Sequence, residues 1–190
     1  MLNTRGPIAL GVLLLIVAGQ PAAAQRVGIS VDATLGAGSS KTNGKYTARS
    51  TNGAAVDVAV GVRKGPIDTS GFIAAANWWA QSAGAQDEVC LPKPGGGCLD
   101  DFPSVSLFGA MAGWQTDNGV VRFAAGPAYG QLDDERALAI QGRADLSAPI
   151  FRYIGIVVSL RGALLPNVAG NRFDLFAASF GVRIANRVTE

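Results

Sequence analysis

The fold of this chain is decided by two neighbouring segments, IGIVVSLR at residues 154–161 and FAASFGVRI at residues 176–184. In each segment every second side chain is apolar, and those between are mostly small or polar. Because successive side chains of a β-strand point to opposite faces, each segment predicts a strand with one apolar face. Turn-forming residues that include Pro166 and Gly170 separate the two, which predicts a β-hairpin.

The same alternation continues through the rest of the chain. It predicts six more strands, at residues 27–35, 56–63, 71–81, 104–115, 120–132 and 138–147. In the segments at 71–81 and 104–115 both faces are apolar or small, so the sequence leaves their orientation open. Asn118 and Gly119 supply a hairpin turn. Consecutive antiparallel strands must stack as two sheets or close on themselves.

The predicted connections are of two kinds, which alternate along the chain. Those after the odd-numbered strands are long or charged, at residues 39–53, 82–101, 133–136 and 166–172. Those after the even-numbered strands are short, at residues 64–69, 116–119 and 148–151. Long loops at one end and tight turns at the other are typical of outer-membrane barrels. We therefore predict an all-β fold, an eight-stranded antiparallel up-and-down transmembrane β-barrel.

The polar faces of these strands contain few of the residues that cover soluble proteins. The chain has only four Lys and three Glu. Its polar faces carry Gly, Ser and Thr, together with Asp32, Asp57, Arg63, Arg122, Arg143, Asp145, Arg161 and Arg183. On the converging walls of a small barrel, arginine and carboxylate side chains can pair. We predict that these eight residues form a charge network in the lumen.

The apolar faces are aliphatic and free of charge along most strands. One Arg that faced lipid at mid-depth would cost about 2–4 kcal/mol, so the absence of charge favours lipid on this side. Aromatic side chains near the strand ends are typical of the girdles at the two membrane interfaces. The predicted girdle residues are Trp78, Trp79, Trp114, Tyr129, Tyr153 and Phe173. Ordinary core filling is the alternative interpretation of the same aromatics.

With this pattern, the chain resembles the small eight-stranded outer-membrane barrels of the OmpA and OmpX type over residues 27–184. The resemblance implies the outer membrane of a Gram-negative-type bacterium as the location. It implies the lipid bilayer and the barrel-insertion machinery as partners. Such proteins usually end on an aromatic residue that the insertion machinery reads. Residues 179–184 resemble that signal, but the chain continues to Glu190 without a terminal Phe.

The first 24 residues predict a cleaved signal peptide. Arg5 precedes an apolar run at residues 8–18, and Ala22, Ala23 and Ala24 form a small-residue cleavage pattern. The run is too short to span a bilayer. The predicted domain organisation is a signal peptide at 1–24 and a β-barrel domain at 25–190.

Two cysteines, Cys90 and Cys98, flank a short Gly- and Pro-rich stretch. In an exported protein the oxidising compartment favours a disulfide between them. A metal site is the alternative, but two thiols without a nearby His are too few ligands.

The sequence lacks the histidine on which the common serine and cysteine hydrolases depend. It contains no His, which removes the usual general base and the commonest metal ligand. The acidic residues at 133–135 predict a solvated loop tip. With 16 Lys and Arg against 14 Asp and Glu, no basic tail or patch indicates nucleic-acid binding. We predict no enzyme activity, no cofactor and no metal.

The interior of an eight-stranded barrel is just wide enough for its own side chains, so we expect a filled lumen rather than a wide pore. The predicted function is structural, adhesive or recognition-related, with a possible extracellular partner at loops 39–53 and 82–101. The alternative is a soluble periplasmic lipocalin-like barrel that binds a small apolar ligand. Its lumen would be lined by Ile154, Ile156, Val158, Phe176 and Phe180, with Arg143, Arg161 and Arg183 in water.

Overall fold

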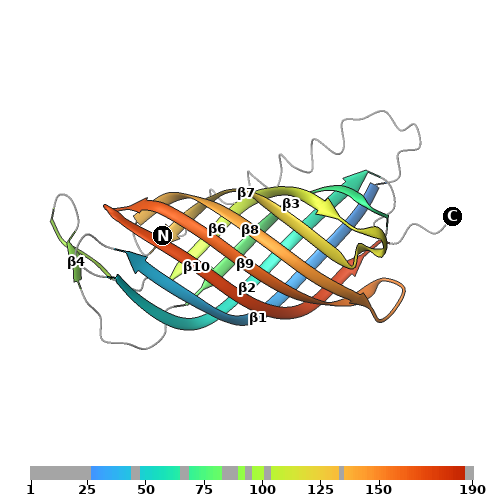
Figure 1. Cartoon of the computed structure of the whole chain (residues 1–190), viewed down its shortest axis with the longest axis horizontal. Helices are drawn as coiled ribbons and strands as arrows, with labels where there is room; N and C mark the ends of the chain where they lie inside the picture. The colour runs from blue at the N-terminus through green and yellow to red at the C-terminus, as the bar shows by residue number, and fades with distance from the viewer. Residues whose placement is uncertain are drawn as a thin grey trace, which may run out of the picture.

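The computed structural model describes residues 27–43, 48–64, 69–82, 90–92, 96–100, 104–132 and 135–186. Eight long strands form a closed barrel, in which each strand pairs antiparallel with its neighbours and β1 pairs with β10 (Figure 1). They are β1 (Val27–Asn43), β2 (Ala48–Lys64), β3 (Gly71–Gln81), β6 (Val105–Gln115), β7 (Val121–Leu132), β8 (Glu135–Pro149), β9 (Ile154–Val168) and β10 (Asn171–Ala185). The predicted all-β, eight-stranded antiparallel barrel is confirmed.

The strands are staggered around the barrel. Paired residues followed once around from Ile29 return to β1 at Ser39, ten residues further along the strand. The path runs through Val62, Ala74, Ala112, Ala125, Gly142, Gly162 and Phe176. Such a stagger requires the strands to tilt relative to the barrel axis, as they do in Figure 1.

The two ends of the barrel differ. At the hairpin end, on the left of Figure 1, β1 turns into β2, β7 into β8 and β9 into β10. The connection between β3 and β6 lies at this end too and contains a small sheet of β4 (Cys90–Pro92) and β5 (Cys98–Asp100). At the terminal end β1 begins and β10 ends, and a 3-10 turn, η1 (Asp117–Gly119), joins β6 to β7.

Three of the four predicted long or charged connections are shorter than predicted, because the strands extend into them. At residues 39–53, β1 and β2 stay paired as far as Asn43 and Ala48. β7 and β8 pair up to Leu132 and Glu135, and the segment at 166–172 contracts to a two-residue turn between β9 and β10. The segment at 39–53 is polar but still alternates, with Ser40, Thr42 and Thr51 buried. Its described residues, 39–43 and 48–53, are strand that extends beyond the band of apolar side chains on the outer face, which we call the apolar belt.

Two predictions fall on parts of the chain about which the structure gives little. The predicted signal peptide lies outside the described residues. For the predicted disulfide only the backbone is described, with Cys90 opposite Asp100 and Cys98 opposite Pro92 in the β4–β5 ladder. The pairing of these cysteines therefore stays a prediction. Among the described residues, no helix has the length and apolar character needed to cross a membrane.

Along each strand, side chains point alternately into the barrel and to its outer face. Along β10, Leu175, Ala177 and Ser179 are buried, whereas Phe176 and Phe180 are exposed. The orientation that the sequence left open for β3 is now assigned, because its odd-numbered residues face inward. Every barrel strand therefore contributes one row of side chains to a common lumen.

Candidate functional site in the barrel lumen

Seven charged side chains gather inside the barrel, in the half nearer the terminal end. We call them the charge layer: Asp32, Asp57, Arg122, Arg143, Asp145, Arg161 and Arg183. None is more than 7% exposed. They come from six strands, because the inward parity of each strand presents one or two of them to the axis.

Arg143 on β8 is the centre of the charge layer. Its Nη2 lies 3.0 Å from Asp32 Oδ2, its Nη1 lies 3.1 Å from Asp57 Oδ2, and its Nε lies 2.5 Å from Asp145 Oδ1. One guanidinium therefore joins three carboxylates from three strands. The planar fork of arginine suits such simultaneous pairing better than a lysine would.

Arg183 and Arg161 extend the layer on either side. Arg183 donates to both oxygens of Asp32, at 2.6 Å from Nε and 2.9 Å from Nη2, and its Nη2 also reaches Asp145 at 2.8 Å. Arg161 Nη2 lies 2.8 Å from Asp57 Oδ1. The Asp57 contacts are ion pairs without hydrogen-bond geometry, whereas those of Asp32 are charge-assisted hydrogen bonds.

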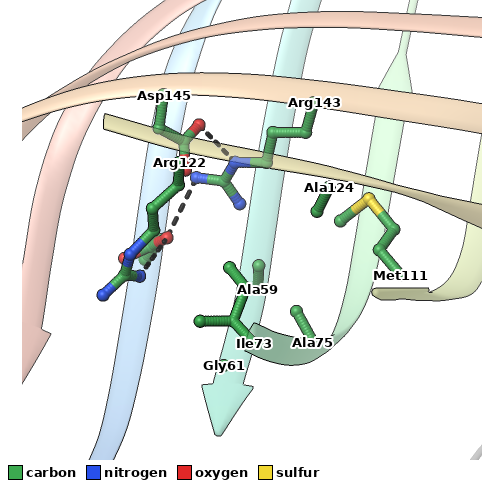
Figure 2. A pocket seen from close by; sticks show the side chains of 10 residues that line it. Ala59, Gly61, Ile73, Ala75, Met111, Arg122, Ala124, Arg143 and Asp145 are labelled. Atoms are coloured by element: carbon green, nitrogen blue, oxygen red, sulfur yellow. Dashed lines mark hydrogen bonds and ion pairs between the residues drawn. The ribbon is translucent and has the colours of Figure 1, made fainter. Parts of the chain in front are cut away.

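Arg122 is the least paired cation of the charge layer. Its Nη1 donates to Ser30 Oγ at 2.9 Å and lies 4.0 Å from Asp32 Oδ2, and its Nε has no hydrogen-bond partner in the structure. Figure 2 shows Arg122, Arg143 and Asp145 beside a small cavity. Small and apolar side chains complete its lining: Ala59, Ile73, Ala75, Met111 and Ala124.

Arg63, the eighth residue predicted for this network, does not join it. It is partly exposed at the terminal end of β2 and donates to backbone carbonyl groups. These are the carbonyls of Lys64, Thr69 and Ser70. Arg63 therefore holds the backbone around the β2–β3 connection instead of pairing with the lumen acids.

The other half of the lumen, toward the hairpin end, is mostly apolar. We call its buried cluster the apolar layer: Ala55, Trp79, Val105, Leu107, Ala128, Leu132, Ala137, Ala139, Ala163, Leu165, Val168, Phe173, Leu175 and Ala177. On β9 the apolar Leu165 and Val168 follow Arg161, and on β10 Phe173 and Leu175 precede Arg183. The order of residues on these strands therefore places the two layers one above the other along the barrel axis.

The predicted aromatic girdle is wrong for Trp79 and Phe173. Both are only 1% exposed and belong to the apolar layer. Trp79 follows Trp78 directly, so the two must point to opposite faces of β3, and Phe173 has the inward parity of β10. Trp78, Trp114, Tyr129 and Tyr153 are exposed, at 36%, 57%, 45% and 47%.

The outer face of the barrel is covered by large apolar side chains. Leu138 is 74% exposed, Phe180 71% and Ile140 66%. The residues that a lipocalin-like lumen would need inside are all outside: Ile154, Ile156, Val158, Phe176 and Phe180. Arg143, Arg161 and Arg183, which that alternative would place in water, are buried. The apolar and charged faces of the strands therefore point in the directions opposite to those that the lipocalin-like alternative requires.

The lumen also contains buried polar pairs that are absent from the sequence-based prediction. The amides of Asn77 and Gln141 hydrogen-bond reciprocally across the barrel, at 3.0 and 2.8 Å, and Gln81 donates to Ser40 at 2.8 Å. Asn77 and Gln141 have the inward parity of their strands, which is the only signal that could have identified them. Nowhere in the described ranges do three His, Cys, Asp or Glu side chains cluster as a metal site would require.

No family model and no curated protein matches this chain. Among solved structures, it is similar to Neisserial surface protein A, with a TM-score of 0.58 and 14% identity over 82% of this chain and 96% of that one. It is also similar to Ail, the attachment invasion locus protein of Yersinia pestis, with a TM-score of 0.46 and 11% identity over 82% and 98%. At this identity the first likeness establishes the fold alone. The chain has the fold of the small eight-stranded outer-membrane barrels.

Proposed function

We propose that this protein is a non-enzymatic barrel of the outer membrane, with a lumen closed by its own side chains and a hairpin end that faces the cell exterior. The observation that carries this proposal is the apolar outer face. On β10 it runs from Phe176 to Ile184, nine residues, which rise about 20 Å along the barrel axis when the strand is tilted by about 40° from that axis. The apolar band of outer-membrane barrels is about 25 Å tall.

A soluble monomer rarely exposes so much contiguous apolar surface. Lipid, by contrast, favours this surface and requires that every backbone group be paired within the barrel, which closure achieves. The buried ion pairs and the apolar layer favour a filled lumen over a diffusion pore. A cleaved signal peptide and the barrel-insertion machinery belong to the same proposal as the route to the membrane.

The first test is fractionation of expressing cells, followed by detergent gels of unheated and boiled membranes. Recovery in the outer membrane with a heat-dependent mobility shift supports the proposal, and recovery as a soluble periplasmic monomer overturns it.

Val158→Arg places a charge in the middle of the apolar face, where Val158 is 51% exposed. It should lower stability in the membrane by about 2–4 kcal/mol. Asn52→Arg, on the outer face of β2 but beyond the belt, is the matched control.

The orientation is tested by labelling with a membrane-impermeant thiol reagent. In a background with Cys90→Ser and Cys98→Ser, Lys41→Cys near the hairpin end should react on intact cells. Lys64→Cys near the terminal end should react only after permeabilisation. The reverse pattern would overturn the exterior position of the hairpin end.

We assign an adhesive, recognition or structural role to the hairpin end because its strands project polar side chains outward beyond the apolar belt. Lys41, Ser50 and Asn52 are exposed there on the paired strands β1 and β2. The partner surface is thus the paired strand ends within 39–53, together with the connection at 82–101. A disulfide between Cys90 and Cys98 would stabilise the connection at 82–101. Thiol counting of the wild-type chain with and without reductant tests this disulfide, and two reactive thiols before reduction would contradict it.

A further inference from the structure

The charge layer is not electrically balanced. It contains four arginines and three aspartates, which are the only buried charged side chains among the described residues. Its formal charge is therefore +1. A buried charge without a compensating partner is costly, because bulk water cannot solvate it. The layer would therefore be stabilised by one further negative charge.

The excess positive charge lies at Arg122, on β7. Its nearest carboxylate oxygen in the described part of the chain, Asp32 Oδ2, is 4.0 Å from Nη1. Each of the other three arginines of the layer has a carboxylate oxygen at 2.8 Å or less. The Nε of Arg122 is buried and has no hydrogen-bond partner among the described residues. Arg122 as a whole is only 5% exposed, so bulk water does not replace the missing partner.

Arg122 lines a cavity of about 20 Å³ (Figure 2). A space of about 10–15 Å³ holds one water molecule, so this cavity has room for a single small guest and not for a polyatomic anion. Much of its wall is small or apolar, with Ala59, Ile73, Ala75 and Met111 among the lining residues. The cavity therefore combines a buried cation with a volume that selects for size.

The hydrogen bonds of the lining indicate what kind of guest fits. Besides Arg122, the charged groups around the cavity are Arg143, Asp32 and Asp145. Every oxygen of the two carboxylates already accepts a hydrogen bond from Arg143 or Arg183. The group that still lacks a partner is a donor, the Nε–H of Arg122. A guest that only accepts hydrogen bonds matches this lining, whereas a water molecule would also bring two protons and no charge.

We propose that this cavity binds one halide ion, chloride under physiological conditions, which accepts a hydrogen bond from Arg122 Nε and balances the charge layer. Asp32 and Asp145 do not oppose the ion, because both are already paired with Arg143 and Arg183. The inference does not depend on the membrane location, because the charge layer lies inside the barrel.

The first test is urea unfolding of the barrel in lipid vesicles, with chloride replaced stepwise by gluconate at constant ionic strength. An ion that binds one site in the folded state alone raises the folding equilibrium constant in proportion to its concentration, once this exceeds the dissociation constant. A tenfold increase in chloride should then raise the constant about tenfold. Arg122→Gln should abolish this dependence. Arg172→Gln, at an exposed arginine, should retain it.

A second variant fills the cavity and keeps the cation. Ala75→Val adds two methyl groups at the cavity wall and should also abolish the chloride dependence. Ala139→Val makes the same change in the apolar layer and should retain the dependence, whatever its effect on stability. Crystals of the wild-type barrel grown in bromide should show an anomalous scattering peak at hydrogen-bond distance from Arg122 Nε.

Four results would overturn the inference. They are a chloride dependence that Arg122→Gln or Ala75→Val retains, a wild-type stability that chloride and gluconate support equally, and a cavity that holds water but no bromide. The fourth is a bromide peak without chloride-dependent stability, which would mean an ion bound at crystal concentration only.

Discussion

The lumen of this barrel is filled in two different ways. In the charge layer, seven side chains are held by ion pairs and hydrogen bonds, most of which join different strands. In the apolar layer, side chains such as Leu107, Leu132 and Leu165 are fully buried and held by packing alone. Both layers use the same inward parity of the same strands, so the backbone does not distinguish them.

The difference lies in how each layer responds to the loss of one member. A buried ion depends on every partner, because removal of one leaves the other charged and unsolvated. An apolar side chain depends on the volume around it, and a swap of similar size is tolerated. We therefore expect the charge layer to be the more fragile of the two, although it need not contribute more to net stability.

The largest expected effect comes from Asp32, which accepts hydrogen bonds from Arg143 and Arg183. Asp32→Asn keeps the shape but leaves four arginines with two aspartates in the layer. It should lower the free energy of unfolding by about 3–5 kcal/mol, measured by urea unfolding from lipid vesicles. Asp174→Asn removes an exposed pair with Arg172 and should cost less than about 1 kcal/mol. Equal losses in the two variants would refute a special role for the charge layer.

The apolar layer should give a smaller effect with a different origin. Leu165→Ala, at a position that is 0% exposed, should lower the free energy of unfolding by about 2–4 kcal/mol. Leu138→Ala on the outer face loses the same methyl and methylene groups, but in the proposed membrane location lipid would fill the space. Its cost should be about 1–2 kcal/mol, the transfer term without a cavity. The difference between the two variants measures the packing of the layer, and no difference would mean that the layer is loosely filled.

The sequence predicted the strands and the orientation of their side chains correctly where one face of a strand carries bulky side chains and the other carries small ones. Val158, Ser159 and Phe180 have the predicted orientation, because their neighbours of the same parity agree. It failed where both faces carry large groups. Trp78 and Trp79 are adjacent and equally apolar, and only the barrel register shows that Trp79 points inward. Phe173 lay outside the predicted strand, so its parity was not used.

The two layers themselves were beyond the reach of the sequence. Alternation identifies inward positions, but their height along the axis follows from the stagger of the strands, which is a property of closure. The contact of Arg143 with Asp57 joins β8 to β2, which are not neighbours in the sheet. A polar stretch such as residues 39–53 likewise predicts a loop until its cross-strand partners are known.

Arg161 lies at the boundary between the two layers, because it contacts Asp57 at 2.8 Å and lies over the ring of Trp79 at 5.8 Å. The strength of its ion pair with Asp57 can be measured. A double-mutant cycle of Asp57→Asn and Arg161→Gln should give a coupling of about 1–3 kcal/mol, because Asp57→Asn removes the acidic partner of Arg161 and Arg161→Gln leaves Asp57 with Arg143 alone. The matched cycle of Asp57→Asn with Arg172→Gln joins a buried to an exposed site. It should be additive within about 0.5 kcal/mol. Equal couplings would show that the Asp57–Arg161 contact is not a specific pair.

The smallest change in the free energy of unfolding is expected for Trp79, on the apolar side of the same boundary. The indole Nε1 of Trp79 is buried without a hydrogen-bond partner in the structure, so its N–H contributes no bond that a substitution could remove. Trp79→Phe keeps an aromatic face under Arg161 and should change the free energy of unfolding by less than about 1 kcal/mol. Trp114→Phe on the outer face is the control for ring size. A loss above about 2 kcal/mol for Trp79→Phe, without a similar loss for Trp114→Phe, would contradict this expectation and show that the indole itself is needed at the boundary.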